Sequence, residues 1–157
     1  MTDTIERSQT HATFVIERSY DAPVARIWRA LSVNDERDHW FGGGDAFDAH
    51  ENTHDFRVGG HAVEAGQWHG GPTSQFRSTY TDIIDQVRMV FTYDMWVDEK
   101  HISTSLTTIA LEPEGEGTRL TYTEQGVHFD GLDSIEGREE GTKGLLDQLG
   151  AFVTDTA

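Results

Sequence analysis

The segment EGREEGTKGLLDQLGAFV, residues 136–153, predicts a long amphipathic helix toward the C-terminal end of the chain. Its apolar face has helical spacing and consists of Leu145, Leu146, Leu149, Phe152 and Val153. Glu139 and Lys143 stand four residues apart, in the order that favours an ion pair on a solvated face. The segment also contains four glycines, and each costs about 1 kcal/mol relative to alanine in a helix interior. We therefore expect tertiary packing to hold this helix, with something lying close against its glycines.

Six stretches before this helix have the β-branched and aromatic composition of strands. They cover about residues 53–58, 61–68, 74–83, 88–97, 102–111 and 118–125. The gaps between them hold glycine, proline and charged turn residues. Such short connections indicate an antiparallel meander, because parallel neighbours need crossovers of a dozen residues or more. A further strand is expected at residues 12–20.

Two short helices are expected between the first strand and the other six. Asp21 can cap the first of them, and Pro23 is tolerated in its first turn. Its apolar stripe consists of Val24, Ile27, Trp28 and Leu31. The second helix is expected to carry Trp40 and Phe41 before the glycine run at 42–44. This order of elements predicts an α+β protein of the helix-grip type, in which a curved seven-stranded antiparallel sheet wraps around the long C-terminal helix.

A wide curved sheet covered by one helix cannot easily fill its own concave side, and pockets form in such places. We therefore expect an apolar cavity between the sheet and the C-terminal helix. Its predicted lining consists of Trp40, Phe41, Phe56, Trp68, Phe76, Tyr80, Tyr93, Tyr122, Glu124, Thr142, Leu145 and Leu149. The many aromatic rings favour a flat apolar or aromatic ligand, and Tyr80, Tyr93 and Tyr122 are the best candidates for orienting it.

Glu124 is the acidic residue most suited to a chemical role. It alternates with Leu120 and Tyr122 on the apolar face of its predicted strand. A partly desolvated carboxylate there would suit general acid–base chemistry or the anchoring of a ligand. The alternative is that Glu124 reaches water at the end of the strand or pairs with an arginine.

The histidines invite a metal hypothesis. Residue types that bind zinc cluster within eight positions, at Asp48, His50, Glu51, His54 and Asp55. A metal-binding pair of histidines four apart needs a helix, whereas this segment follows the glycine run and leads into a strand. We interpret it as a polar loop, and we expect no metal and no other cofactor. His101 is expected in a hairpin turn, and His128 in the loop before the last helix.

The composition limits the classes of function. The chain has 28 acidic and 12 basic residues and a formal net charge of −16, which repels nucleic acids and anionic membranes. It has no cysteine, which excludes disulfides and thiolate sites. The sequence has no apolar stretch near the ~20 residues of a membrane span, and its first seven residues lack a secretion signal. We expect a cytoplasmic protein with one domain, residues 12–155, after a flexible lead of residues 1–11.

Five short motifs, taken in order, resemble the START-like (SRPBCC) superfamily. They are Tyr20-Asp21-Ala22-Pro23 with Ile27–Leu31, Trp40-Phe41, Asp55–Gly60, Leu111-Glu112-Pro113 with Gly117–Thr121, and Glu140-Gly141 through Leu145–Asp147. Among its branches the sequence is most similar to the bacterial set named after the C-terminal domain of the activator of the heat-shock-protein-90 ATPase. The resemblance extends over about residues 12–153.

The resemblance implies a START/Bet v-like helix-grip fold with a cavity, but relatives of this fold serve many functions. Three functions remain open: binding of a small apolar or aromatic molecule without catalysis, regulation of a chaperone ATPase partner, and a cyclase or aromatase activity that uses Glu124 or a cavity tyrosine. Many members of the branch carry tryptophan where this chain has Thr142, which implies a wider or more polar cavity here. The oligomeric state also stays open, a homodimer included.

Overall fold

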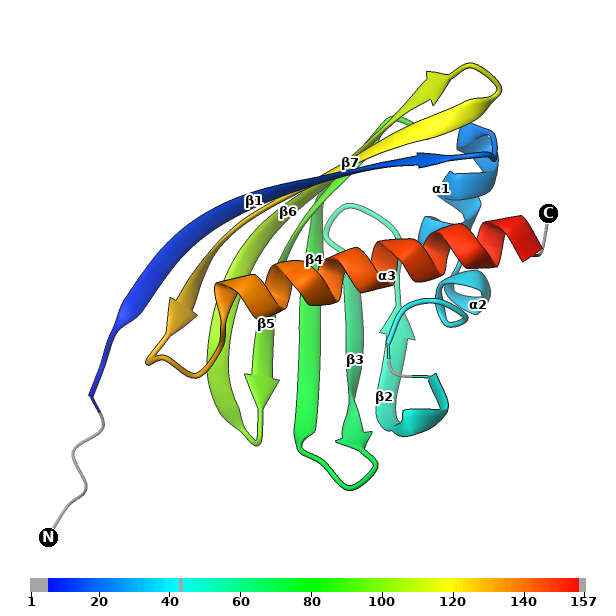
Figure 1. The fold of residues 1–157 in the computed structure, drawn as a ribbon. Helices are drawn as coiled ribbons and strands as arrows, with labels where there is room; N and C mark the ends of the chain where they lie inside the picture. The colour runs from blue at the N-terminus through cyan, green and yellow to red at the C-terminus, as the bar shows by residue number, and fades with distance from the viewer. Residues whose placement is uncertain (1–5, 43, 156–157) are drawn as a thin grey trace, which may run out of the picture.

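The computed structural model describes residues 6–42 and 44–155. Figure 1 shows the course of the chain. The elements are β1 (Gln9–Tyr20), α1 (Val24–Ser32), α2 (Asn34–Arg37), a 3₁₀ turn (Gly44–Ala46), β2 (Phe47–His54), β3 (His61–Trp68), β4 (Thr73–Ile84), β5 (Arg88–Val97), β6 (Lys100–Glu114), β7 (Gly117–Phe129) and α3 (Ile135–Asp155). Within this part of the chain, no helix has the length and apolar character that crossing a bilayer requires.

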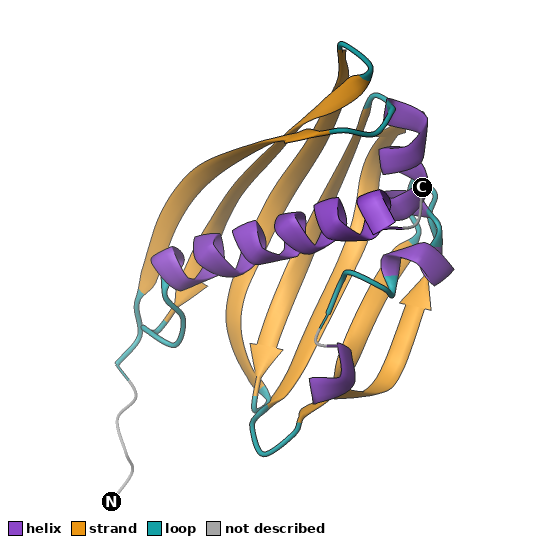
Figure 2. Ribbon diagram, turned by 45° about the vertical axis from the view of Figure 1, so that its right-hand side comes forward, coloured by secondary structure: helices purple, strands orange, loops and turns teal. Residues whose placement is uncertain are grey.

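The strands form one seven-stranded antiparallel sheet in the order β1-β7-β6-β5-β4-β3-β2. Consecutive strands from β2 to β7 are neighbours, as their short connections predict, and β1 closes the order by pairing with β7. Figure 2 shows the sheet curving around α3, with α1 and α2 near the C-terminal end of that helix. The predicted helix-grip architecture is confirmed.

The main core lies where α1 and α3 meet the sheet. Ile27 and Leu31 of α1 are buried, and so are Leu146, Leu149 and Val153 of α3. These positions belong to the apolar stripes that the sequence predicts. Packing of these stripes, rather than helix propensity, stabilises the helices.

Polar contacts fix the ends of these elements. The hydroxyl of Tyr20 donates a hydrogen bond of 2.8 Å to the carbonyl oxygen of Leu146, which joins β1 to α3. The Oγ1 of Thr118 donates one of 2.7 Å to the carbonyl oxygen of Ala22, which joins β7 to the turn before α1. Both bonds are buried, so each offsets the desolvation of its own partners.

The second strand was predicted at the wrong place. Strand β2 is Phe47–His54, whereas residues 55–60 form the turn into β3. The segment FDAHENTH looks like a loop because it is polar, and it is polar because β2 is an edge strand of the sheet. The turn needs its glycines, since Gly59 has a φ of +84° and a Cβ at Gly60 would collide with the carbonyl oxygen of Asp55.

Three smaller predictions near the N-terminal side are also wrong. Trp40 and Phe41 follow α2, which ends at Arg37, instead of lying on it. Helix α1 begins after Pro23, and no described side chain, Asp21 included, caps it. Strand β1 begins at Gln9, so residues 9–11 pair with β7 instead of forming a lead. Residues 1–5 of that expected lead lie outside the described residues.

The glycines of α3 differ in their surroundings. A Cβ added at Gly150 would lie 3.0 Å from the ring of Tyr20, and one at Gly137 would lie 3.4 Å from Ser134. At Gly141 and Gly144 it would meet no described atom within 4 Å beyond the helix's own backbone. The expected close packing against the glycines is therefore confirmed at Gly150 and wrong at Gly141 and Gly144.

Gly144→Ala should raise the free energy of unfolding by about 1 kcal/mol, because alanine removes the helix penalty of glycine at an exposed position with open space. Gly150→Ala is the matched control and should gain clearly less, since the Tyr20 ring is tethered by its hydroxyl and cannot move away freely. Urea unfolding at equilibrium measures both changes. An equal gain at the two positions would contradict this account of the Tyr20 contact.

Candidate functional site

A cavity of about 500 Å³ lies between α3 and the inner face of the sheet. Its walls are mostly apolar and aromatic. The predicted residues that line it are Trp40, Phe41, Trp68, Phe76, Tyr80, Tyr93, Tyr122, Thr142 and Leu145. Phe56, Glu124 and Leu149 do not line it: Phe56 packs edge-on against Trp28 and Tyr80, Leu149 is in the core, and Glu124 lies behind the tyrosines.

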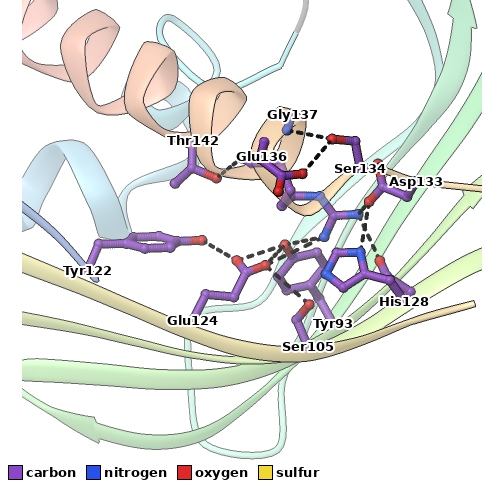
Figure 3. A network of polar contacts seen from close by, with 12 residues as sticks. Tyr93, Ser105, Tyr122, Glu124, His128, Asp133, Ser134, Glu136, Gly137 and Thr142 are labelled. Carbon is purple, nitrogen blue, oxygen red and sulfur yellow. Dashed lines mark hydrogen bonds and ion pairs between the residues drawn. The ribbon is translucent and has the colours of Figure 1, made fainter. Parts of the chain in front are cut away.

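Glu124 is the centre of a buried hydrogen-bond network. Its side chain is 1% exposed, as its alternation with Leu120 and Tyr122 predicts. The hydroxyl of Tyr93 donates to the carboxylate at 2.8 Å, and the hydroxyl of Tyr122 donates at 2.9 Å. The hydroxyls of Ser105 and Thr107 donate at 3.2 and 3.4 Å. Figure 3 shows the carboxylate held between these groups, below the first turns of α3.

Arg138 of α3 completes this network from the helix side. Its Nη1 lies 3.5 Å from a carboxylate oxygen of Glu124 and donates to the Tyr93 hydroxyl at 2.9 Å. Its Nη2 donates to Ser103 at 2.8 Å and to Asp133 at 2.7 Å. Burial acts to lower the pKa of Arg138, but Tyr93 and the two carboxylates outweigh it and raise the pKa. The guanidinium therefore stays charged beside Glu124.

The two tyrosines keep their protons. Burial, and after it the charge of Glu124, raises the pKa of both Tyr93 and Tyr122. Each phenol is therefore a hydrogen-bond donor to the carboxylate. Both oxygens of Glu124 are engaged, which confirms the alternative that it pairs with an arginine. The network joins β5, β6 and β7 to the first turns of α3, and it forms one end of the cavity, where Arg138 and Asp133 are part of the lining.

A second polar group lines the other part of the cavity. Arg37, the last residue of α2, is 6% exposed, and its guanidinium lies over the ring of Phe41 at 3.8 Å from the centroid. Glu64 of β3 is half-buried and also belongs to the lining. Burial raises the pKa of Glu64 and lowers that of Arg37, and each charge partly opposes this effect on the other. A side chain at Gly42, whose φ is +94°, would collide with the Glu64 carboxylate.

His54 lies beside this group. Its Nε2 is 2.7 Å from the hydroxyl of Tyr80. Burial, and next the charge of Arg37, lowers the pKa of His54 from 6.5 to about 4, so the ring is neutral at pH 7. Burial raises the pKa of Tyr80, so the phenol donates its proton to the imidazole.

The histidines occupy other surroundings than the sequence predicts. His50 and His54 lie on the strand β2 and not in a loop, and a bulge between Ala49 and Glu51 interrupts the pairing around His50. His128 is a buried residue of β7 and bonds to Asp133, and His101 is on β6 with its ring stacked on Trp96. Among residues 6–42 and 44–155, no three His, Asp or Glu side chains are grouped so that they could hold a metal ion.

The three charged lining residues that sequence reasoning missed left unequal signals. Arg138 precedes Thr142, Leu145 and Leu149 by 4, 7 and 11 positions, so it belongs to the inner stripe of α3 and could have been found. Glu64 shares the inner face of β3 with Ala62 and Trp68 by alternation. Arg37 left no such signal, because a helix of four residues has no periodicity to interpret.

Arg138→Leu should lower the free energy of unfolding by about 3 kcal/mol, because it leaves Glu124 as a buried charge without its cation. Adding Glu124→Gln to this variant should restore part of the loss, since the amide carries no charge. Arg88→Leu, which breaks the exposed pair with Asp82, is the control and should cost less than about 1 kcal/mol. Urea unfolding of the four proteins gives these values. A cost for Arg138→Leu as small as the control, or no recovery in the double variant, would be inconsistent with the network.

Comparison with known proteins places the chain among relatives of similar length. The family described as "Activator of Hsp90 ATPase homolog 1-like protein" matches residues 21–154. The Mll3558 protein from Rhizobium loti is 44% identical, with a TM-score of 0.85, and the match covers 92% of this chain and 99% of that one. An uncharacterized protein from Rhizobium leguminosarum is 37% identical, with a TM-score of 0.90, over 96% and 99% of the two chains.

More distant structures support the fold alone. An AHSA1-like protein from Aeromonas hydrophila is 18% identical, with a TM-score of 0.69, over 92% of this chain and 93% of that one. No curated protein matches the chain. The function therefore has to be argued from the cavity and the side chains around it.

Proposed function

We propose that this chain, which belongs to the family of activator of Hsp90 ATPase homolog 1-like proteins in the SRPBCC superfamily, binds a small apolar or aromatic molecule between α3 and the sheet. The observation that carries the proposal is the cavity of about 500 Å³ with its largely apolar and aromatic lining. Pockets for small molecules have volumes in this range, and most of their walls are apolar with a few polar groups at fixed places.

The aromatic walls favour a flat ligand. Phe76 lies between Phe41 and Tyr93, with centroid distances of 5.2 and 4.8 Å, and Phe91 lies 6.1 Å from Tyr93. These rings support one another at edge-on and tilted angles and hold the shape of the wall. A planar apolar molecule could make the same kinds of contact with them without moving the backbone.

Proton transfer by Glu124 is less well supported. A general base needs a lone pair directed at its substrate, whereas the oxygens of Glu124 accept hydrogen bonds from Tyr93, Tyr122 and their neighbours. The carboxylate also lies behind the lining instead of in it. Its position suits a residue that holds Arg138 and the tyrosines in place, so we favour binding over a cyclase or aromatase reaction. The cavity gives no argument for regulation of a chaperone ATPase, which the family description suggests.

The fluorescent probe N-phenyl-1-naphthylamine should bind in the cavity and raise the melting temperature by several degrees at a hundredfold excess over its Kd, which corresponds to about 2.7 kcal/mol. Thr142→Trp should abolish this shift, because Thr142 lines the cavity and the larger side chain fills it. Thermal unfolding and probe fluorescence measure the two effects.

The control for this experiment is Lys143→Trp, which adds the same ring to α3 at a residue outside the lining. It should bind the probe as the wild type does. If the wild type does not bind, or if Thr142→Trp keeps its fold and binds unchanged, the proposal is wrong.

A further inference from the structure

Two buried charged groups at the Arg37 part of the cavity have atoms without a partner. The Nη1 of Arg37 and the Oε2 of Glu64 are buried, and neither has a hydrogen-bond partner among the described residues. No ion pair within 4.0 Å joins the two side chains in this part of the structure, although each affects the pKa of the other. A donor and an acceptor of opposite charge therefore line the same cavity with a gap between them.

Such atoms are costly. Burying a polar atom without a hydrogen bond costs about 1–3 kcal/mol, and more when the group is charged, so native proteins satisfy nearly all of them. The other part of the cavity follows this rule, since the two Nη atoms of Arg138 donate to Tyr93, Ser103 and Asp133. The contrast between the two arginines indicates that something other than the described side chains completes Arg37 and Glu64.

The guanidinium of Arg37 is held in a way that leaves its donors available. Its face lies on the ring of Phe41 at 3.8 Å and near that of Phe76 at 5.9 Å. The N–H donors of arginine lie in the guanidinium plane, so stacking on its face does not occupy them. The stacked rings fix the direction of these donors, and the same rings form the wall of the cavity.

We propose that Arg37 and Glu64 form a polar subsite that binds a neutral group with an acceptor and a donor side by side, such as the carboxamide of an aromatic amide. The acceptor would take a hydrogen bond from Arg37, and the donor would give one to Glu64. This inference rests on the proposed function, since the apolar part of the same ligand would occupy the aromatic part of the cavity.

The pair of opposite charges argues for a neutral group. A carboxylate would be attracted by Arg37 but repelled by Glu64, and an ammonium group would meet the reverse. A ketone would satisfy Arg37 alone and would leave the carboxylate without a donor. Sites that hydrogen-bond a polar group reject analogues that lack it, because the buried groups are then left unpaired.

Three probes of similar shape test the subsite: 2-naphthamide, 2-acetonaphthone, which has the acceptor but no donor, and 2-naphthoate. Titration calorimetry at pH 7 should give the amide about tenfold tighter binding than the ketone, since a hydrogen bond to a charged group is involved. The carboxylate should bind more weakly than the amide. 2-Methylnaphthalene, which has neither donor nor acceptor, reports on the apolar cavity alone.

Two variants identify the residues. Glu64→Leu should reduce the preference for amide over ketone to about onefold and should strengthen binding of 2-naphthoate, because the charge of Arg37 is no longer opposed. Arg37→Met should weaken the amide and the ketone while leaving 2-methylnaphthalene unchanged. The gain of naphthoate binding in Glu64→Leu is a readout that loss of structure cannot produce, so it stands even if Arg37→Met does not fold.

The outcomes separate this inference from the proposed function. If 2-methylnaphthalene binds but the wild type binds amide and ketone equally, or if the preference survives Glu64→Leu, the subsite is wrong and the apolar cavity stands. If none of the four probes binds, both the cavity function and the subsite are overturned.

Discussion

A single helix has to cover one face of a much larger curved sheet, and the rest of the structure follows from this mismatch. Helix α3 has 21 residues and covers a strip roughly 10 Å wide. The strands it crosses have 8 to 15 residues, which corresponds to roughly 26–50 Å. Helices α1 and α2 cover one end of the exposed area (Figure 1), and aromatic side chains cover part of the remainder. The cavity is the volume that these elements leave.

Two arginines enter this apolar space, and their surroundings differ in a way that divides structure from function. Arg138 reaches down from α3 to Glu124 on β7, and nearby side chains supply its hydrogen bonds. This pairing fixes the first turns of the helix relative to the sheet. Arg37 rests on Phe41, and its Nη1 remains without a partner among the residues described. The same chemical group thus closes one part of the cavity and leaves the other part able to recognise a ligand.

The fold could be predicted because it depends on patterns that are local in the sequence. Alternation identified β3 to β7, and the stripe containing Leu146 and Leu149 identified α3. Strand β2 was misplaced because an edge strand carries polar residues on both faces, so alternation does not mark it. The turn at residues 55–60 was taken for its start because Phe56 and Val58 are apolar.

The site was harder to predict than the fold. The aromatic lining and the burial of Glu124 followed from the inner faces of the strands, since alternation assigns each residue to a face. The partners of Glu124 could not be deduced, because its contact with Arg138 depends on how α3 lies across the sheet. The burial of Arg37 likewise depends on tertiary contacts with Phe41 and Phe76, and no pattern in the four residues of α2 indicates it.

Native mass spectrometry of the protein purified from its own cells tests most directly whether the cavity holds a small molecule. Gentle ionisation preserves a ligand enclosed between α3 and the sheet, and denaturation releases it for identification. We expect a species heavier than the chain by the mass of one small organic compound, and we expect that compound to carry an aromatic or otherwise apolar body. Spectra that contain the mass of the bare chain alone, with nothing released on denaturation, would contradict this account.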